Sequence, residues 1–116
     1  MKILFLDDNE DRWIHFKNVV DYDVAQWAQT AKECIHWLQK EKYDQVCLDH
    51  DLGGEVFVDS DREDTGMEVV RWIVANKPQI DEIYVHTHNQ PAGIRMATSL
   101  REAGYSVTYV PFGVML

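Results

Sequence analysis

The chain has 116 residues, enough for one hydrophobic core, and we expect a single domain over residues 1–116. It carries 20 Asp and Glu against 11 Lys and Arg, and this acidic balance argues against a broad basic face for duplex nucleic acid. No apolar stretch is long enough to cross a membrane, and the first residues lack the pattern of a signal peptide. Cys34 and Cys47 lie in apolar periodic segments and are expected to be buried free thiols. We therefore expect a cytoplasmic protein.

Strand and helix patterns alternate along the chain. Short apolar runs predict buried strands, and apolar residues spaced three and four apart predict helices. In chain order the expected elements are a strand at 2–6, a helix at 9–20, a strand at 23–27, a helix at 30–40, a strand at 45–48, a helix at 65–75, a strand at 82–86, a helix at 91–103 and a strand at 106–110. Thr30 with Glu33 forms a capping box, and Gly104 suits the end of the last helix.

Repeated strand–helix units predict an α/β fold, a doubly wound parallel sheet of five strands. The expected strand order is 2-1-3-4-5, as in flavodoxin-like folds, with ligands bound at the carboxyl ends of the strands. Residues 111–116 leave no room for a fifth helix, so one face of the sheet is expected to be incompletely covered. Either this apolar tail or a second copy of the chain, in a homodimer, would cover that face.

Four acids follow two of the predicted strands. Asp7 and Asp8 end the first run, and Asp49 and Asp51 end the third. Carboxylates gathered at one sheet edge repel each other unless a cation neutralises them, and helix capping would explain only one of the four. We therefore predict a divalent metal site with these four acids as ligands. Oxygen ligands favour Mg²⁺ or Mn²⁺, with Zn²⁺ or Fe²⁺ as alternatives.

Histidines follow the fourth predicted strand in the run His86-Thr87-His88-Asn89. His86 and His88 are candidate catalytic residues, either as general acid or base or as softer metal ligands. Thr87 and Asn89 are candidates for binding substrate phosphate, although Asn89 also suits the cap of the next helix. His50, between Asp49 and Asp51, is a further catalytic candidate, although on an extended strand end it points to the opposite face.

Two more features are considered as parts of the site. Arg95 lies early in the predicted helix 91–103, where it either clamps a phosphate or faces solvent. Residues 50–64 form a long polar loop with an acidic run around Asp61. A loop of that length in a small domain is commonly functional or mobile. The acidic run itself suits a solvated surface, with a further ligand for the site as the alternative.

The opening Lys2-Ile3-Leu4-Phe5-Leu6-Asp7-Asp8 resembles that of a two-component receiver domain. Tyr43-Asp44-Gln45-Val46-Cys47-Leu48-Asp49 resembles the strand that carries the receiver phosphoacceptor, which falls on Asp49. Further matches are Gly66, Thr87, Ala103-Gly104-Tyr105 and Pro111-Phe112. The likeness spans the chain apart from the last helix.

Three departures separate the chain from ordinary receivers. Receivers carry a Lys before the Pro-Phe pair that contacts the phosphoryl group, and here Val110 stands in that place. They also lack the Asp-His-Asp triplet at 49–51 and the His-Thr-His-Asn run at 86–89. These features resemble the divergent receiver-like group proposed to process cyclic phosphates in RNA repair, often encoded by phages.

This resemblance implies a metal-dependent phosphoesterase, a hydrolase that acts on a small-molecule or RNA-end phosphate such as a 2′,3′-cyclic phosphate. Asp49 would take part in the chemistry as well as in metal binding. One alternative is a signalling receiver that is phosphorylated on Asp49. A second alternative is a catalytically inactive module that binds a phosphate or a partner protein.

Overall fold

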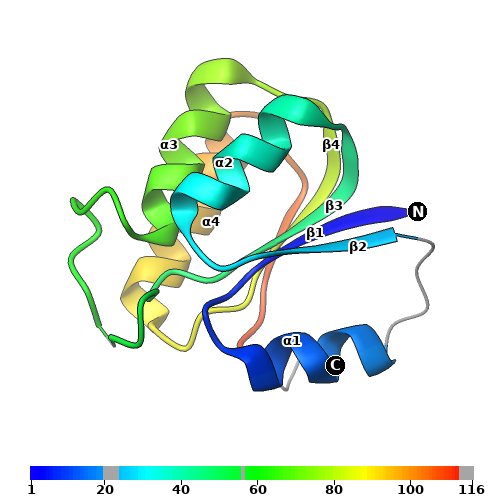
Figure 1. Ribbon diagram of the computed structural model, residues 1–116. Helices are drawn as coiled ribbons and strands as arrows, with labels where there is room; N and C mark the ends of the chain where they lie inside the picture. The colour runs from blue at the N-terminus through cyan, green and yellow to red at the C-terminus, as the bar shows by residue number, and fades with distance from the viewer. Residues whose placement is uncertain (20–23, 56, 113–116) are drawn as a thin grey trace.

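The computed structural model describes residues 1–19, 24–55 and 57–112. Its elements alternate as predicted: β1 Lys2–Leu6, α1 Glu10–Val19, β2 Val24–Ala28, α2 Ala31–Lys40, β3 Tyr43–Leu48, α3 Gly66–Asn76, β4 Ile80–Val85, α4 Gln90–Glu102 and β5 Val107–Tyr109. The strands are parallel and stand in the order β2-β1-β3-β4-β5, which confirms the predicted fold and strand order. Figure 1 shows the sheet between its helices.

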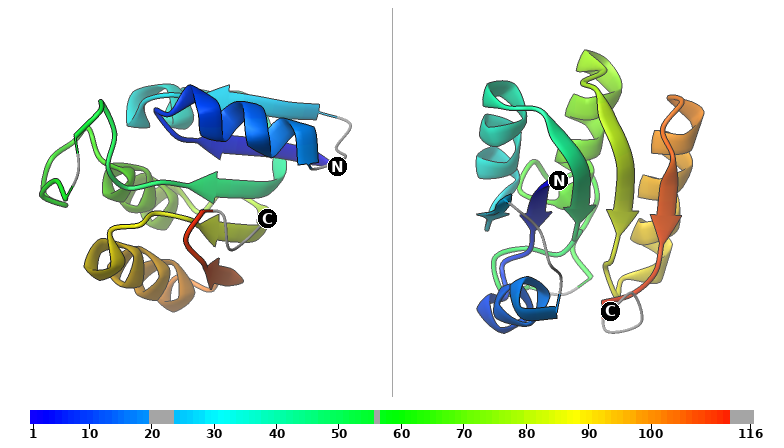
Figure 2. Two further views of the ribbon diagram at one scale, coloured as in Figure 1. Left: turned by 90° about the horizontal axis from the view of Figure 1, so that it is seen from below. Right: turned by 90° about the vertical axis from the view of Figure 1, so that its right-hand side faces the viewer.

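Helices α2, α3 and α4 lie on one face of the sheet and α1 lies on the other (Figures 1 and 2). Alternate residues of each strand point to opposite faces, so Leu4 and Leu6 of β1 join the core under α2 to α4. Ile3 and Phe5 join a smaller aromatic core with Phe16 of α1. Both faces of β1 are therefore buried, as expected for a central parallel strand.

Several element boundaries differ from the predicted ones. β3 begins at Tyr43 rather than at residue 45, because the Tyr43 ring is buried in the larger core. β4 runs from Ile80 to Val85, so His86 lies just beyond it. Val20 of the predicted first helix and Asp23 of the predicted second strand lie outside the described residues.

Side chains cap two helices as the sequence indicated. Thr30 Oγ1 accepts a hydrogen bond from the Glu33 amide at 3.0 Å, which starts α2. Asn89 Oδ1 accepts one from the Ala92 amide at 3.3 Å, which starts α4. These caps fix where each helix begins after the strand before it.

The face under α1 is closed at the β4 side by Phe112. Its ring lies 6.1 Å from the Phe5 ring and 5.8 Å from the His86 ring, centroid to centroid. The Phe112 amide donates to the His86 carbonyl oxygen at 2.9 Å, which holds the segment against the sheet. The described residues after β5 form no helix, and residues 113–116 of the apolar tail lie outside the described part of the chain.

Both cysteines are buried free thiols, as predicted. Within the described ranges, none of the helices has the length and apolar character needed to span a bilayer.

Candidate metal and phosphate pocket

The carboxyl ends of three central strands meet at one edge of the sheet. The residue that follows each strand still forms a backbone hydrogen bond to the adjacent strand. The Asp49 amide donates to the Leu6 carbonyl of β1 at 3.1 Å, and the His86 amide donates to the Leu48 carbonyl of β3 at 3.0 Å. The ligand atoms of Asp7, Asp49 and His86 consequently lie within 4.8 Å of one another. The predicted gathering of acids and histidine is therefore present for these three residues.

Asp7 is fully buried and surrounded by donors. Its Oδ2 is 3.0 Å from His86 Nε2 and 3.4 Å from Arg12 Nη1, and its Oδ1 accepts from the Asn9 amide at 2.9 Å. Burial opposes ionisation of Asp7, but the hydrogen bond and charge of His86 outweigh it. These contacts hold the pKa of Asp7 below its ordinary value, so this carboxylate stays charged.

Asp49 is only 3% exposed and has weaker support. Its Oδ1 accepts from the His50 amide at 2.8 Å, and its Oδ2 is 3.6 Å from Arg12 Nη1. Burial raises the pKa of Asp49 to about 7, and the nearby charge of Asp7 adds to the rise. Without a further cation, Asp49 therefore takes up a proton near neutral pH while Asp7 remains ionised.

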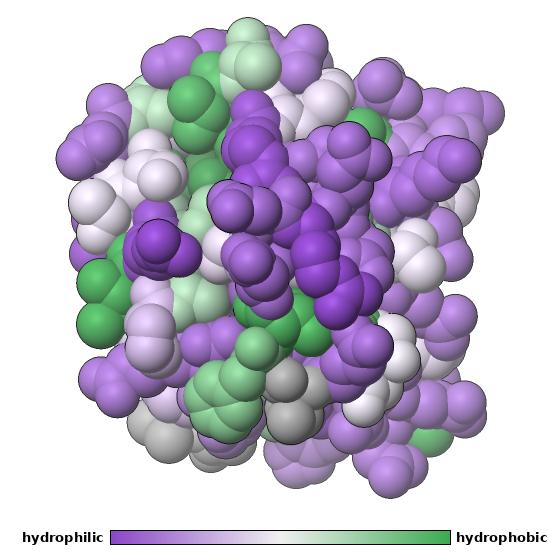
Figure 3. Space-filling model, turned by 90° about the vertical axis from the view of Figure 1, so that its left-hand side faces the viewer, coloured by the Kyte–Doolittle hydropathy of each residue, from purple (hydrophilic) through white to green (hydrophobic). Residues whose placement is uncertain are grey.

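A pocket of about 330 Å³ opens beside Asp49, at the lower end of the range of about 300–1,000 Å³ for ligand sites. Its lining residues come from the strand ends, the start of α1 and the 50–64 loop: Asp8, Asn9, Arg12, Asp49, Asp51, Gly54, Glu55, Thr87 and His88. Asp8 is half-buried there, and its Oδ2 accepts from the Gly54 amide at 2.6 Å. The edge of the molecule that carries the strand ends is mostly hydrophilic, as Figure 3 shows.

Gly66 explains how Asp49 is placed at this edge. The Gly66 amide donates to the His50 carbonyl at 2.9 Å, and a Cβ on Gly66 would collide with the Asp49 carbonyl oxygen. Only glycine allows the start of α3 to lie so close to the end of β3.

Asp51 lines the pocket, but its carboxylate also holds the 50–64 loop. It accepts from His50 Nδ1 at 2.7 Å, from the amides of Phe57 at 2.7 Å and Val58 at 3.2 Å, and from Asn89 Nδ2 at 3.1 Å. Burial works against its charge, but these hydrogen bonds keep the pKa of Asp51 below its ordinary value. Its predicted role as a metal ligand stays a prediction, since any ion would compete with these donors.

His50 is fully buried and is absent from the lining of the pocket. Its Nδ1 bonds to Asp51 and its Nε2 lies 2.9 Å from Ser60 Oγ, so both ring nitrogens have partners. These contacts tie the start of the long loop, at Asp51, to Ser60 farther along it. In this position His50 organises the loop, and its predicted catalytic role is not tested by the geometry.

Replacing His50 by Ala is expected to lower the free energy of unfolding by about 2–4 kcal/mol. The change leaves a cavity and removes the ring partner from both Asp51 and Ser60. Urea unfolding measures the effect. His36→Ala is the matched control, because His36 is exposed on α2 and its loss should cost under about 0.5 kcal/mol. Equal effects in the two variants would contradict this role for His50.

The two histidines after β4 occupy different places. His86 is fully buried, stacks on the Phe5 ring at 4.9 Å and lies behind Asp7, and its Nδ1 has no hydrogen-bond partner among the described residues. His88 is exposed and lines the pocket. The structure therefore brings His88, rather than His86, to the space that a substrate would enter.

Thr87 and Asn89 both take structural roles. Thr87 lines the pocket, and its Oγ1 accepts from the Asn89 amide at 3.1 Å. Asn89 is buried, caps α4 and donates to Asp51. Of these two, Thr87 is the one that lines the pocket, and phosphate contacts by either residue stay predictions.

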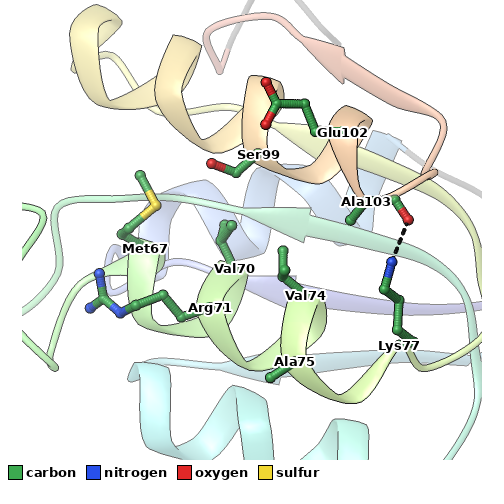
Figure 4. Close-up of a pocket in the computed structure, with 9 residues that line it drawn as sticks. All are labelled: Met67, Val70, Arg71, Val74, Ala75, Lys77, Ser99, Glu102 and Ala103. Carbon is green, nitrogen blue, oxygen red and sulfur yellow. Dashed lines mark hydrogen bonds between the residues drawn. The ribbon is translucent and has the colours of Figure 1, made fainter.

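Arg95 does not line this pocket. It is exposed on α4 and lines a separate hollow with Ser60, Asp61 and Arg71, among others. A larger hollow of about 490 Å³ lies between α3 and α4 (Figure 4). Its walls include apolar side chains such as Val70 and Val74, and Lys77 Nζ there donates to the Ala103 carbonyl at 2.9 Å. Neither hollow contains the acids or histidines of the strand ends, so the smaller pocket is the candidate functional site.

Arg12 is a pocket residue that the sequence analysis missed. It lies in the first turns of α1, and its Nη1 approaches both Asp7 and Asp49. The sequence did contain an indication that Arg12 lies in the pocket. It stands four residues after Asp8, about one helical turn, at the start of the helix that follows a central strand. Its positive charge offsets part of the negative charge of the acid cluster, the carboxylates of Asp7, Asp8 and Asp49.

Solved structures that resemble this chain include receiver domains and response regulators. The signal receiver domain of a putative LuxO repressor protein from Vibrio parahaemolyticus has a TM-score of 0.70 and 20% identity, over 97% of this chain and 78% of that one. A CheY-like receiver domain protein from Methanospirillum hungatei JF-1 has a TM-score of 0.71 and 18% identity, over 97% and 81%. The response regulator TrrA from Thermotoga maritima, solved in complex with Mg²⁺ and BeF, has a TM-score of 0.65 and 22% identity, over 95% and 84%.

At these identities the likeness shows the fold alone. No curated protein matches the chain. A family model described as the cyclic-phosphate processing receiver domain matches residues 2–102, which includes every strand end that contributes to the pocket. The chain therefore belongs to the family of cyclic-phosphate processing receiver domains.

Proposed function

We propose that this protein is a metal-dependent phosphoesterase that acts on a small-molecule or RNA-terminal phosphate, with a 2′,3′-cyclic phosphate as the leading candidate substrate. One observation carries the proposal: Asp8, Asp49 and His88 line the same pocket at the carboxyl edge of the sheet. The pocket thus combines ligands for a hard cation with an imidazole that can donate or accept a proton. The name of the family supports the same substrate class.

The acid cluster fits a divalent metal ion. Asp8 and Asp49 present carboxylate oxygens to the pocket, and Asp7 adds a negative charge behind them. The raised pKa of Asp49 supports this fit, because a nearby cation would restore its charged form. Oxygen ligands favour Mg²⁺ or Mn²⁺, and the nearness of His86 Nε2 leaves Zn²⁺ or Fe²⁺ as alternatives. A bound ion would hold the phosphate oxygens and lower the pKa of a water molecule.

His88 would supply proton transfer. It is exposed in the pocket wall, where its ring can approach the leaving oxygen of a bound ester. His86 would act through Asp7 instead, because its Nε2 bonds to that carboxylate and its ring is sealed beneath Phe5 and Phe112. The Thr87 side chain, also in the pocket lining, would contact a phosphate oxygen.

A signalling receiver is the second candidate function. Its support is the position of Asp49, which matches the receiver phosphoacceptor, together with structural neighbours that are response regulators. Incubation with acetyl phosphate and Mg²⁺ separates the two candidates. A stable phosphoryl group, detected by intact-protein mass spectrometry in the wild type but not in Asp49→Asn, would favour signalling, whereas ester hydrolysis without it would favour the phosphoesterase.

Divalent ions are expected to raise the melting temperature of the wild-type protein. The ion binds the folded acid cluster but not the unfolded chain, so at 100 times its Kd it stabilises by about 2.7 kcal/mol. Differential scanning fluorimetry with Mg²⁺, Mn²⁺ and Zn²⁺ measures the shift. Asp8→Asn should remove most of it, whereas Asp61→Asn, in the exposed acidic run, should not. A melting curve that none of the three ions changes would contradict the metal site.

The homodimer suggested by the sequence also remains a proposal. Sedimentation at several protein concentrations tests it directly.

A further inference from the structure

The lining of the pocket is strongly acidic. Asp8, Asp49, Asp51 and Glu55 all line it, and Arg12 is the single Arg or Lys among its described lining residues. A phosphate that enters this space meets carboxylates on several sides, which repel it at short range. Binding therefore requires positive charge inside the pocket, and a divalent ion bound to the acids would supply only part of it.

Arg12 is placed to contact an anion as well as the acids. Its Nη1 lies 3.4 Å from Asp7 Oδ2 and 3.6 Å from Asp49 Oδ2. Both contacts are longer than the roughly 2.7–2.9 Å of a tight charge-assisted hydrogen bond. They also use the same nitrogen, so Nε and Nη2 lie outside these two ion pairs. With 31% of its side chain exposed, the guanidinium can exchange these loose contacts for a bidentate one to phosphate.

The fold also holds Arg12 in place from two sides. Its amide donates to Asn9 Oδ1 at 3.2 Å in the cap of α1. Its Cζ lies 5.9 Å from the centre of the Phe112 ring, a cation–π distance. Phe112 is itself tied to the His86 carbonyl, so the guanidinium rests on a ring fixed to the end of β4. A guanidinium held in this way loses less conformational freedom when it binds a ligand.

We propose that Arg12 is the anion-binding residue of this pocket and that it contacts two oxygens of a terminal or cyclic phosphate. This inference rests on the proposed phosphate chemistry, and it assigns a substrate-binding role to a residue outside the Asp and His clusters. The same geometry gives Arg12 a second effect. Because its guanidinium lies near the carboxylates of Asp7 and Asp49, it competes with a metal ion for binding to these carboxylates.

The test measures binding of inorganic phosphate and of Mg²⁺ separately, by isothermal titration calorimetry. Arg12→Gln should weaken phosphate binding, measured with Mg²⁺ present, by about 10- to 100-fold, the loss expected for a charged hydrogen-bonding partner. Its Mg²⁺ affinity should stay equal or increase, because a competing cation is gone. Arg12→Lys, which keeps the charge but not the bidentate geometry, should lie between Arg12→Gln and the wild type. Arg95→Gln is the matched control and should bind phosphate as the wild type does.

A purely structural role for Arg12 predicts another result, in which Arg12→Gln weakens Mg²⁺ and phosphate binding together and lowers the melting temperature. That result would overturn the inference, as would equal phosphate affinity in wild type and Arg12→Gln, or no phosphate binding by the wild type. Turnover of a 2′,3′-cyclic nucleotide by the wild type is assayed in parallel. If phosphate binding depends on Arg12 but the wild type shows no turnover, the phosphoesterase proposal is wrong and the role of Arg12 stands. If the wild type turns over the nucleotide but Arg12→Gln binds phosphate with unchanged affinity, the role of Arg12 is wrong and the phosphoesterase proposal stands.

Discussion

Asp49→Asn is expected to abolish hydrolysis of a 2′,3′-cyclic nucleotide and, in metal-free protein at pH 8, to make the fold more stable. Both results follow from the surroundings of Asp49, which is 3% exposed and close to the charged Asp7. Asn has nearly the same shape and carries no charge, so it removes repulsion from the cluster. It also removes a ligand for the metal, and with it the chemistry that we propose.

The sign of the pH dependence follows from the raised pKa. Burial moves the pKa of Asp49 from 3.8 to about 7, so between these values the folded protein holds a proton that the unfolded chain has released. Stability therefore falls as pH rises from about 4 to about 7, and the whole loss persists above 7. Asn escapes this loss, and the variant should gain roughly 1–4 kcal/mol over the wild type at pH 8 but almost nothing at pH 4.

Urea unfolding in EDTA at pH 4, 6 and 8 measures the difference between Asp49→Asn and the wild type. The difference isolates Asp49 and the two groups coupled to it, Asp7 and His86, because titrating groups farther away contribute equally to both proteins. Adding saturating Mg²⁺ at pH 8 should reverse the order, since the ion stabilises only the protein that keeps the carboxylate. A difference that is the same at all three pH values would show that Asp49 is not held near neutrality by its surroundings.

The sequence was sufficient to predict the strand order and the position of the acids. Alternation of strand and helix patterns leaves few topologies, because parallel strands need right-handed crossovers. The runs Lys2–Leu6 and Tyr43–Leu48 end in acids, and parallel neighbours must bring those ends to one edge. The gathering of Asp7, Asp49 and His86 therefore follows from periodicity and topology alone.

The division of roles among these residues was beyond sequence reasoning. Consecutive residues alternate between faces, so Asp7 is buried against His86 while Asp8 lines the pocket, and sequence spacing alone does not tell which is which. The role of Asp51 depends on the path of the 50–64 loop, because its carboxylate accepts hydrogen bonds from backbone amides of that loop. The direction in which Arg95 points is set by the rotation of α4 about its axis, and this side chain lines another hollow. Arg12 was missed because its placement in the pocket is set in the same way by the rotation of α1.

His88→Ala is expected to slow hydrolysis of a 2′,3′-cyclic nucleotide by about 10²–10⁴-fold, the usual contribution of a general acid or base. The imidazole is exposed in the pocket wall, so its removal should leave the melting temperature within about 1–2 °C of the wild type, since exposed side chains contribute little to stability. Steady-state kinetics over a metal titration, with a melting curve for each protein, measures both effects. If His88 binds the metal instead, excess metal should restore much of the rate.

His86→Ala provides the contrast, because His86 is fully buried, stacked on Phe5 and bonded to Asp7. Its loss leaves a cavity in the aromatic core and removes a partner of the Asp7 carboxylate, so we expect a loss of about 2–4 kcal/mol in stability. The pKa of Asp7 would then rise, because His86 no longer stabilises its charged form, and activity should fall together with stability. A wild-type rate in His88→Ala, with a large rate loss in a fully folded His86→Ala, would reverse the two assignments. Wild-type rates in both variants would remove histidine from the mechanism altogether and leave proton transfer to water bound at the acid cluster.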